Sequence, residues 1–207
     1  MMYKRMTSPS PLTRGKLHEY WKKPWDGNNL PESYLRGEEK SKFLVEIVKK
    51  YSTSNAKILE IGCNVGRNLN YLFLNGFKNL EGIEISDEAV QLLKHTYPEM
   101  ERHTKIHNAA VEEIIREFRD YEFDIVFTMA VLEHVHPDSE WIFSEIVRIT
   151  NHILVTIEDE YAASWRAFPR NYKRVFTHLG MKQIEDINCG EIDGLGDSFF
   201  ARIFKRR

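Results

Sequence analysis

The sequence predicts an α/β domain built on an open, doubly wound sheet. Strand and helix patterns alternate from residue 57 to about residue 179, and the chain then ends in two strand patterns in succession. Several strand patterns are short apolar runs, which are typical of parallel strands buried on both faces. A length of 207 residues with 42% hydrophobic content suits a single core. Ligands of such sheets bind beyond the carboxyl ends of the strands.

The first predicted strand runs directly into a glycine-rich turn. Ile58, Leu59 and Ile61 suit a buried strand, and Gly62 and Gly66 follow just before a helical pattern. Glycine allows a sharp turn and lets a ligand lie against bare backbone, while the next helix offers unpaired amides. Taken alone, the turn is compatible both with a nucleotide-like ligand and with a purely structural strand-to-helix connection.

The remaining elements follow from hydrophobic periodicity and from capping residues. Ser86 or Asp87 is expected to cap one helix and Asp138 another, and Pro169 is expected near the start of the last helix. Helices are expected around residues 43–51, 69–76, 86–98, 111–118, 138–149 and 169–179, and strands around residues 80–85, 104–107, 123–128, 153–157, 181–188 and 198–204.

The N-terminal residues differ in composition from the rest. Residues 1–16 are rich in Ser, Pro, Thr and basic groups and predict a mobile extension. Residues 18–37 combine large aromatic side chains with Pro and Gly, which indicates an ordered but irregular arm. We therefore divide the chain into an extension with a lid arm, residues 1–37, and a single domain, residues 38–207.

Composition excludes several classes of protein. A net charge of −2 argues against a general polyanion binder. Cys63 and Cys189 are the only cysteines and lie far apart, so neither a disulfide framework nor a structural zinc site is expected. No apolar run approaches the roughly 20 residues of a membrane helix. We expect no membrane partner and a cytoplasmic location.

Three motifs, in order, carry a family resemblance. They are residues 60–66 (Glu-Ile-Gly-Cys-Asn-Val-Gly), the acidic end of residues 81–86, and residues 123–135. The combination resembles class I S-adenosylmethionine-dependent methyltransferases, particularly the group acting on small molecules. The resemblance implies a Rossmann-like, mostly parallel seven-stranded sheet with an antiparallel last strand. It also implies S-adenosyl-L-methionine as cofactor and S-adenosyl-L-homocysteine as product.

The resemblance assigns a cofactor pocket to the ends of these strands. Glu60 would contact the ammonium group of the cofactor, and Glu84 would accept both ribose hydroxyls, although a helix-capping or solvated carboxylate is the alternative reading of Glu84. The family's acidic contact to adenine is missing here, where Asn108 or backbone groups would substitute. The expected cofactor-binding residues are Glu60, Gly62, Cys63, Asn64, Gly66, Glu84, Ile85, Asn108, Ala109, Ala110, Met129, Tyr20 and Trp25.

Methyl transfer from a sulfonium is an in-line displacement that needs alignment and exclusion of water rather than a covalent intermediate. His134 is the expected catalytic residue, because imidazole can take a proton near neutral pH. A histidine that only fixes a loop is the alternative. Residues 129–134 resemble a metal-binding variant of the family, but Ala130 replaces its first Glu, so no metal site is expected.

Acceptor recognition is expected outside the cofactor half. The arm could close over the cleft, or its aromatics could only pin it to the domain. Arginines among aromatics after residue 160 could grip a phosphate or carboxylate, or form a solvated helix face. We expect a small-molecule acceptor, anionic or sugar-like, and not a nucleic acid. The expected substrate-binding residues are Trp21, Leu132, Glu158, Tyr161, Arg166 and Arg170.

Three functions stay open at this point. The first is methylation of an oxygen or nitrogen of a small molecule. The second is methylation of nucleic acid or protein, against which stands the sequence Thr-Met-Ala-Val at residues 128–131, where enzymes that methylate exocyclic base amines carry an Asn/Asp-Pro-Pro-aromatic motif. The third is a cofactor-binding interaction protein without turnover, or a nicotinamide-binding domain, which would predict a G-x-G-x-x-G turn.

Overall fold

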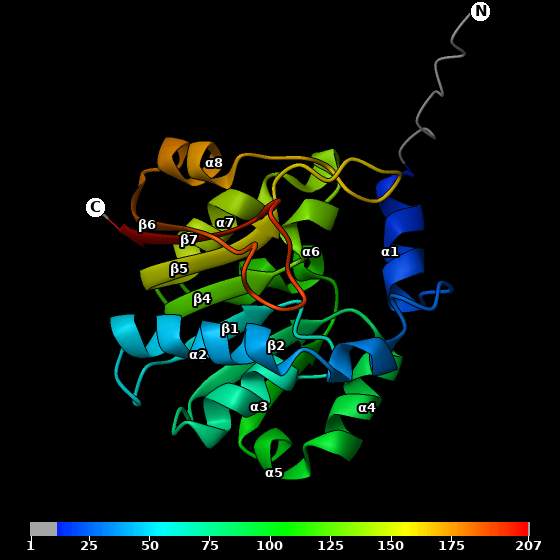
Figure 1. Cartoon of the computed structure of the whole chain (residues 1–207), viewed down its shortest axis with the longest axis horizontal. Coiled ribbons are helices and arrows are strands. Elements are labelled where there is room, and N and C mark those ends of the chain that lie inside the picture. Colours follow the sequence, from blue (N-terminus) through cyan, green and yellow to red (C-terminus); the bar gives the residue numbers. More distant parts are fainter. Residues whose placement is uncertain (1–11, 207) are drawn as a thin grey trace, which may run out of the picture.

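The computed structural model describes residues 12–206, and its centre is one twisted sheet (Figure 1). Within these residues the sheet has seven strands in the order β3-β2-β1-β4-β5-β7-β6. The strands are β1 (Ile58–Ile61), β2 (Leu80–Glu84), β3 (Thr104–Asn108), β4 (Phe123–Met129), β5 (Thr150–Asp159), β6 (Met181–Asn188) and β7 (Phe199–Arg206).

Strand pairing confirms the predicted doubly wound, mostly parallel sheet. β1 lies between β2 and β4 and is parallel to both, with Ile61 opposite Ile83 on one side and Thr128 on the other. β7 inserts between β5 and β6 and is antiparallel to each. The chain moves outward from β1 to β3 and then returns to β4, so the order of strands reverses between β1 and β4. A crevice for ligands is expected at that point.

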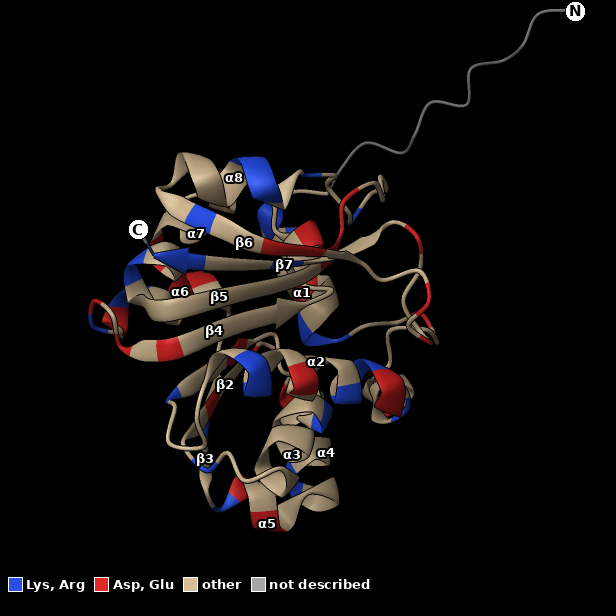
Figure 2. Ribbon diagram, turned by 60° about the vertical axis from the view of Figure 1, so that its left-hand side comes forward, with Lys and Arg blue, Asp and Glu red and all other residues tan. Residues whose placement is uncertain are grey.

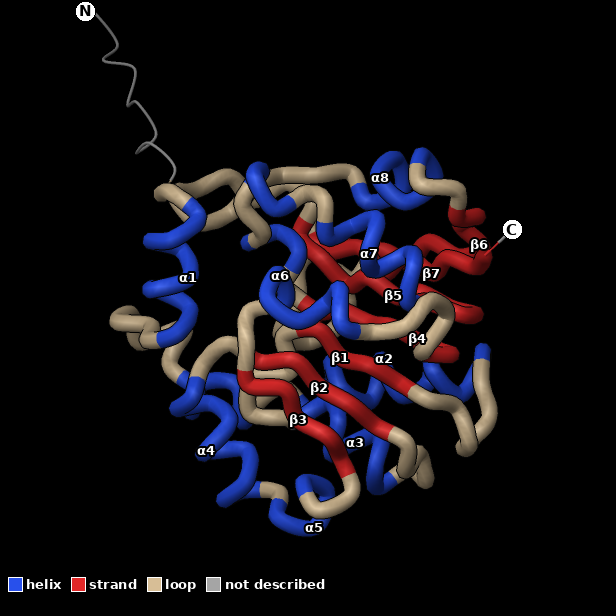
Figure 3. Tube along the Cα trace, turned by 180° about the vertical axis from the view of Figure 1, so that it is seen from behind, coloured by secondary structure: helices blue, strands red, loops and turns tan. Residues whose placement is uncertain are grey.

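Helices cover both faces of the sheet. They are α1 (Arg14–Lys22), α2 (Glu38–Tyr51), α3 (Arg67–Leu74), α4 (Asp87–Thr96), α5 (Pro98–Glu101), α6 (Val111–Ile114), α7 (Ile142–Ile149) and α8 (Tyr172–His178). Ile58 packs with the core that includes α2 and α3, whereas Leu59 and Ile61 pack with the opposite core that includes α7 and α8. Successive residues of the strand therefore point to opposite faces and pack into two separate cores. The view from behind shows α6, α7 and α8 over this second face (Figure 3).

Three helix boundaries differ from the prediction. Asp138 does not cap α7, because it lies in a separate 3-10 turn over Pro137–Ser139 and α7 begins at Ile142. α8 begins at Tyr172 rather than near Pro169, since the Asn171 side chain accepts a hydrogen bond from the backbone N–H of Arg174 at 2.8 Å. The helix expected over residues 111–118 is one α-turn followed by a 3-10 turn over Ile115–Glu117.

The arm is more regular than predicted, because it contains the helix α1. Leu17 and Tyr20 are buried, and the Tyr20 hydroxyl donates to Asp26 at 2.6 Å and accepts from Asn29 at 2.8 Å. Most of the extension predicted over residues 1–16 lies outside the described residues, and α1 begins at Arg14 within it.

Charged residues fall mainly on the helices and loops, with fewer on the strands (Figure 2). One exception is a buried ion pair between β5 and β7, where the Arg202 guanidinium contacts both Glu160 oxygens at 2.6 and 2.8 Å and Asp186 at 2.6 Å. In residues 12–206, no helix combines the length and apolar character needed to cross a membrane.

We expect Arg202→Ala to destabilise the fold by about 3 kcal/mol or more, because it leaves the Glu160 carboxylate buried without its partner. Urea unfolding followed by circular dichroism measures this. Lys42→Ala, which removes an exposed ion pair with Glu39, is the control and should leave the unfolding midpoint unchanged. Equal midpoints for both variants would contradict a stabilising role for the buried pair.

Candidate active site

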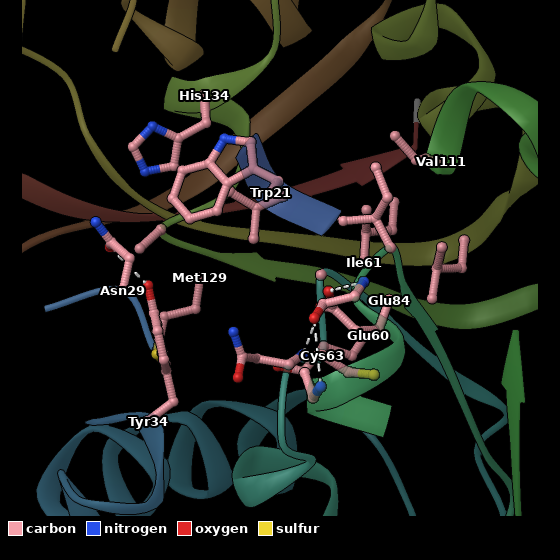
Figure 4. A pocket seen from close by; sticks show the side chains of 18 of the residues that line it. Trp21, Asn29, Tyr34, Glu60, Ile61, Cys63, Glu84, Val111, Met129 and His134 are labelled. Carbon is pink, nitrogen blue, oxygen red and sulfur yellow. Dashed lines mark hydrogen bonds between the residues drawn. The ribbon is translucent and has the colours of Figure 1, made fainter. Parts of the chain in front are cut away.

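A deep cavity opens where β1, β2 and β4 end and the arm crosses the sheet edge (Figure 4). Its walls come from the turn after β1, the ends of β2 and β4, the arm, and the loop between β6 and β7. Cavity and mouth together hold about 1390 Å³ free of protein atoms. Part of this volume is open solvent at the mouth, and the remainder has room for a nucleoside-sized ligand.

The turn after β1 depends on glycine. Gly62 and Gly66 both have left-handed backbone angles, with φ of 75° and 74°. A Cβ on Gly62 would lie 2.5 Å from the Val131 side chain, and one on Gly66 would lie 2.6 Å from Leu93. Side chains are therefore excluded from both positions by conformation and by space. Gly62 lines the cavity, while Gly66 shapes the turn from outside the lining.

Glu84 holds this turn to the next strand. One carboxylate oxygen accepts the backbone N–H of Asn64 at 2.8 Å, and the other accepts that of Ser86 at 2.8 Å. Burial raises the pKa of Glu84, and this effect outweighs the hydrogen bonds, which lower the pKa. The carboxylate is thus fixed in orientation at the end of β2 and borders the cavity, so each oxygen can accept a further hydrogen bond from a ligand.

Glu60 at the end of β1 is 2% exposed and only half satisfied. One oxygen accepts from the Asn68 amide at 2.8 Å, and the other is buried with no hydrogen-bond partner among residues 12–206. Burial raises the pKa of Glu60 to about 8. A buried oxygen that lacks a donor and borders a cavity is a ready acceptor for a cationic N–H group of a ligand.

The far end of the cavity is apolar. Ala109, Ala110 and Val111 line it beside Ile85, the residue that follows β2. Asn108 does not line the cavity, because its side-chain amide donates to the backbone oxygen of Glu84 at 3.0 Å. Small apolar side chains of this kind can contact the face of a ring such as a purine.

His134 lies on the arm side of the cavity, against Trp21 with ring centroids 4.6 Å apart (Figure 4). Its Nδ1 is 2.8 Å from the Arg166 backbone oxygen, so Nδ1 carries the hydrogen, and its Nε2 is 3.5 Å from a Glu133 oxygen. Burial lowers the pKa of His134 to about 4. The imidazole is therefore neutral at pH 7 and only a weak base.

The structure brings most of the predicted pocket residues together. The lining includes Trp21, Glu60, Gly62, Cys63, Asn64, Glu84, Ile85, Ala109, Ala110, Met129 and His134. Other predicted residues lie outside the lining, namely Tyr20, Trp25, Gly66, Asn108, Leu132, Glu158, Tyr161, Arg166 and Arg170.

The residues outside the lining have other contacts. Arg170 pairs with Glu140 at 3.0 Å and donates to backbone oxygens, and Arg166 lies over the Tyr20 and Trp21 rings, so both arginines hold loops. Trp25 is 68% exposed and Tyr161 is 69% exposed. Among residues of α1 and the arm, Trp21 is the aromatic that borders the cavity close to His134.

Several lining residues were missed from the sequence. Asn29, Tyr34 and Lys40 come from the arm and the start of α2, Leu195 comes from the β6–β7 loop, and Phe199 is the first residue of β7. The Tyr34 hydroxyl donates to Asn29 at 3.0 Å, which fixes both side chains. Local spacing gave no sign of these positions. The residues of the arm and α2 meet Leu195 and Phe199 only because β7 returns beside β5.

Comparison with known proteins agrees with this geometry. Residues 59–152 match the family model described as a methyltransferase domain. Over 144 residues the chain is 28% identical to tRNA N(3)-cytidine methyltransferase METTL8, mitochondrial, from Mus musculus. The match covers 63% of this chain and 44% of that protein, so the chain spans less than half the length of this relative.

Two solved structures share the fold. Magnesium protoporphyrin IX methyltransferase (ChlM) from Synechocystis PCC 6803, with bound S-adenosylmethionine, superposes with a TM-score of 0.69 at 15% identity, covering 97% of this chain and 100% of that one. The PH0226 protein from Pyrococcus horikoshii OT3 gives 0.67 at 15% identity, covering 91% and 99%. At these identities the likeness concerns the fold alone.

The cavity fits the cofactor that the family uses. The unpartnered Glu60 oxygen suits an ammonium group, the fixed Glu84 carboxylate suits vicinal hydroxyls, and the slot at Ala109 and Ala110 suits an adenine ring. Residues 59–152, the segment that builds these elements, match the family model, so this part of the chain is identified as a methyltransferase domain, and it has the fold of an S-adenosylmethionine-binding methyltransferase.

Proposed function

We propose that the enzyme transfers the methyl group to an oxygen or nitrogen of a small acceptor bound between the arm and the end of β4. The observation that carries this proposal is the second half of the cavity. Beyond Met129 it is walled by Trp21 and Tyr34 of the arm and by Leu195 and Phe199. This half is mostly apolar and is roofed by residues far apart in sequence, as expected for a site that excludes water from a sulfonium.

In this proposal the cofactor lies across the glycine turn. Glu60 receives its ammonium group, Glu84 receives its ribose hydroxyls, and the apolar slot at Ala109 receives adenine. The methyl group then points toward Met129 and the acceptor half. The chain's contribution is alignment of the acceptor with the methyl group and exclusion of water, which are the main requirements of an in-line displacement.

His134 contributes position more than basicity. A pKa of about 4 makes it a poor acceptor for a full proton at pH 7, although its neutral ring can accept a hydrogen bond. The acceptor therefore binds as a neutral amine or as an easily ionised hydroxyl, and its proton leaves to solvent after the methyl group has moved.

Lys40 supports an anionic acceptor. Its side chain lies between Gly37 and Gly194 and borders the cavity, and the one carboxylate that raises its pKa in the described part of the chain is that of Asp193. Burial and the nearby Arg67 lower its pKa, which an anion beside it would reverse. The arginines expected for this role, Arg166 and Arg170, are occupied elsewhere.

A nucleic-acid acceptor is the second candidate, because a relative that matches 63% of the chain is a tRNA cytidine methyltransferase. A single base turned out of its stack could enter the same half-cavity. Both candidates share the cofactor site and differ in what occupies the space beside Trp21.

The test is transfer of isotopically labelled methyl from S-adenosylmethionine into three separated pools: small metabolites, total RNA and total protein. We expect label in the metabolite pool. Label confined to RNA would replace the first candidate with the second, and label in none of the pools would contradict both.

Glu84→Gln should weaken binding of S-adenosylhomocysteine by about ten- to a hundredfold, or about 1.5 to 3 kcal/mol, because the amide cannot accept at both ends. Calorimetry measures the affinity. Glu81→Gln is the matched control: it lies on the same strand, is also buried, and pairs with Lys57 and His107 outside the cavity. Equal affinities of both variants would remove Glu84 from the site.

Binding of S-adenosylhomocysteine should strengthen as pH rises from 6 toward about 8, because Glu60 has a pKa of about 8 and must lose its proton before it can pair with the ammonium group. The affinity should change by up to about tenfold per pH unit and level off near the pKa. Calorimetry in buffers of different ionisation enthalpy should register proton release. Glu60→Gln should abolish this release; if the variant keeps it, another group is responsible.

Lys40→Met should lower methyl transfer into the acidic fraction of the metabolite pool by about tenfold or more, as expected for loss of a charged hydrogen bond. Affinity for S-adenosylhomocysteine should change little. Lys42→Met, exposed on the same helix, is the control. A large loss of S-adenosylhomocysteine affinity with no loss for 5′-methylthioadenosine would instead assign Lys40 to the carboxylate of the cofactor.

A further inference from the structure

The turn that leaves β4 forms the wall between the cofactor half of the cavity and the arm. Ala130 opens it with a left-handed φ of 55°, which is unusual for a residue with a side chain. Val131 then packs on the bare backbone of Gly62, and His134 packs against Trp21. The position of this short turn therefore sets both the cofactor wall and the docking surface of the arm.

A carboxylate from the neighbouring strand holds the turn from behind. Glu158, at the end of β5, is 0% exposed and lies outside the cavity lining. One of its oxygens accepts the backbone N–H groups of Val131 at 2.9 Å, Leu132 at 3.0 Å and Glu133 at 3.4 Å. These are the first amides of the 3-10 turn over Leu132–His134, which have no carbonyl partners within the turn.

Glu133, within the turn, contacts β5 in return through its carboxylate. One oxygen of Glu133 accepts the backbone N–H of Asp159 at 2.6 Å, and the other lies 3.5 Å from His134 Nε2. The two glutamates therefore make reciprocal contacts: Glu158 on β5 accepts hydrogen bonds from the turn, and Glu133 in the turn accepts one from β5. We call Glu133 and Glu158 the glutamate clamp.

The glutamate clamp is costly for the fold. Its two buried carboxyl groups repel each other, Asp159 adds repulsion, and Arg166 is the opposing cation beside Glu133. Burial and this repulsion raise the pKa of both Glu133 and Glu158 well above the usual range of a carboxyl group. Apolar residues of similar volume would fill this space at lower cost, so the arrangement serves geometry rather than stability.

We propose that Glu158 and Glu133 are positioning residues that fix the 130–134 turn so that Val131 seats on Gly62 and His134 receives Trp21 of the arm. Glu158 was expected from the sequence to contact the substrate. It would instead act on the acceptor site indirectly, by holding the turn that lines it. The inference rests on the proposed acceptor half for its meaning in catalysis, but its structural content can be tested without any acceptor.

The test follows His134 and the arm together. In protein labelled with 15N-histidine, two-bond 1H–15N spectra of the full chain should show His134 as the Nδ1–H tautomer with a pKa of about 4. In Glu158→Ala we expect mixed tautomers and a higher pKa. Trypsin cleavage after the exposed Lys22 of the arm should also be about tenfold faster or more, as expected when a local contact is lost.

Two further variants separate positioning from general destabilisation. Glu158→Gln keeps one oxygen that can accept from the three amides. Unlike Glu158→Ala, it should show the wild-type His134 spectrum and the wild-type protection of the arm from trypsin. Glu160→Gln alters another buried glutamate just beyond the same strand, paired with Arg202 and not with the turn. It should lower the urea midpoint and leave His134 unchanged.

The proposal is overturned if Glu158→Ala keeps the native His134 spectrum and arm protection, or if Glu160→Gln disturbs them equally. Should Glu158→Ala fail to fold, Glu133→Ala supplies the test, since it removes the bond to Asp159 and leaves the three amide contacts in place. It should broaden the His134 signal and speed arm cleavage, and unchanged values would again overturn the proposal. Failure to find a methyl acceptor would leave all these readouts intact, so the two proposals fail separately.

Discussion

The site depends on one close approach: Val131, after β4, rests on the backbone of Gly62, after β1. β1 and β4 are neighbours at the point where the order of strands reverses, so the turns that follow them diverge to opposite faces and leave a crevice. A side chain at residue 62 would push these turns apart. The glycine therefore allows the turns after β1 and β4 to stay in contact at the cavity wall.

Acidic groups surround this crevice, and most are incompletely neutralised. Glu60 keeps one oxygen without a partner, and burial raises the pKa of Glu60 and of Glu84. Such groups cost free energy in the free protein. The methyl donor is a sulfonium with an ammonium group, so its positive charge offsets this cost when it binds. The electrostatics of the site are thus matched to the bound state rather than to the empty fold.

The proposed acceptor half of the cavity is assembled from distant segments. Trp21 and Tyr34 reach it because the arm docks on the domain, where His18 pairs with Glu112 at 3.0 Å and the Arg67 guanidinium donates to the Tyr34 backbone oxygen at 2.8 Å. Phe199 reaches it because β7 returns beside β5. Sequence reasoning identified the arm as an aromatic element near the cleft. It did not separate Trp21, which faces the cavity, from Trp25, which faces solvent, because that choice depends on how α1 packs.

The sequence by itself determined the sheet, the order of its elements and the cofactor turn, because hydrophobic period, glycine and capping residues act over a few neighbouring positions. Tertiary structure decided the rest. Asp138 lost its capping role to a separate turn, Arg170 was drawn to backbone oxygens, and Glu133 gained a partner on β5. These outcomes depend on contacts between segments that are distant in the chain, and local pattern carries no information about which of several charged residues such contacts will select.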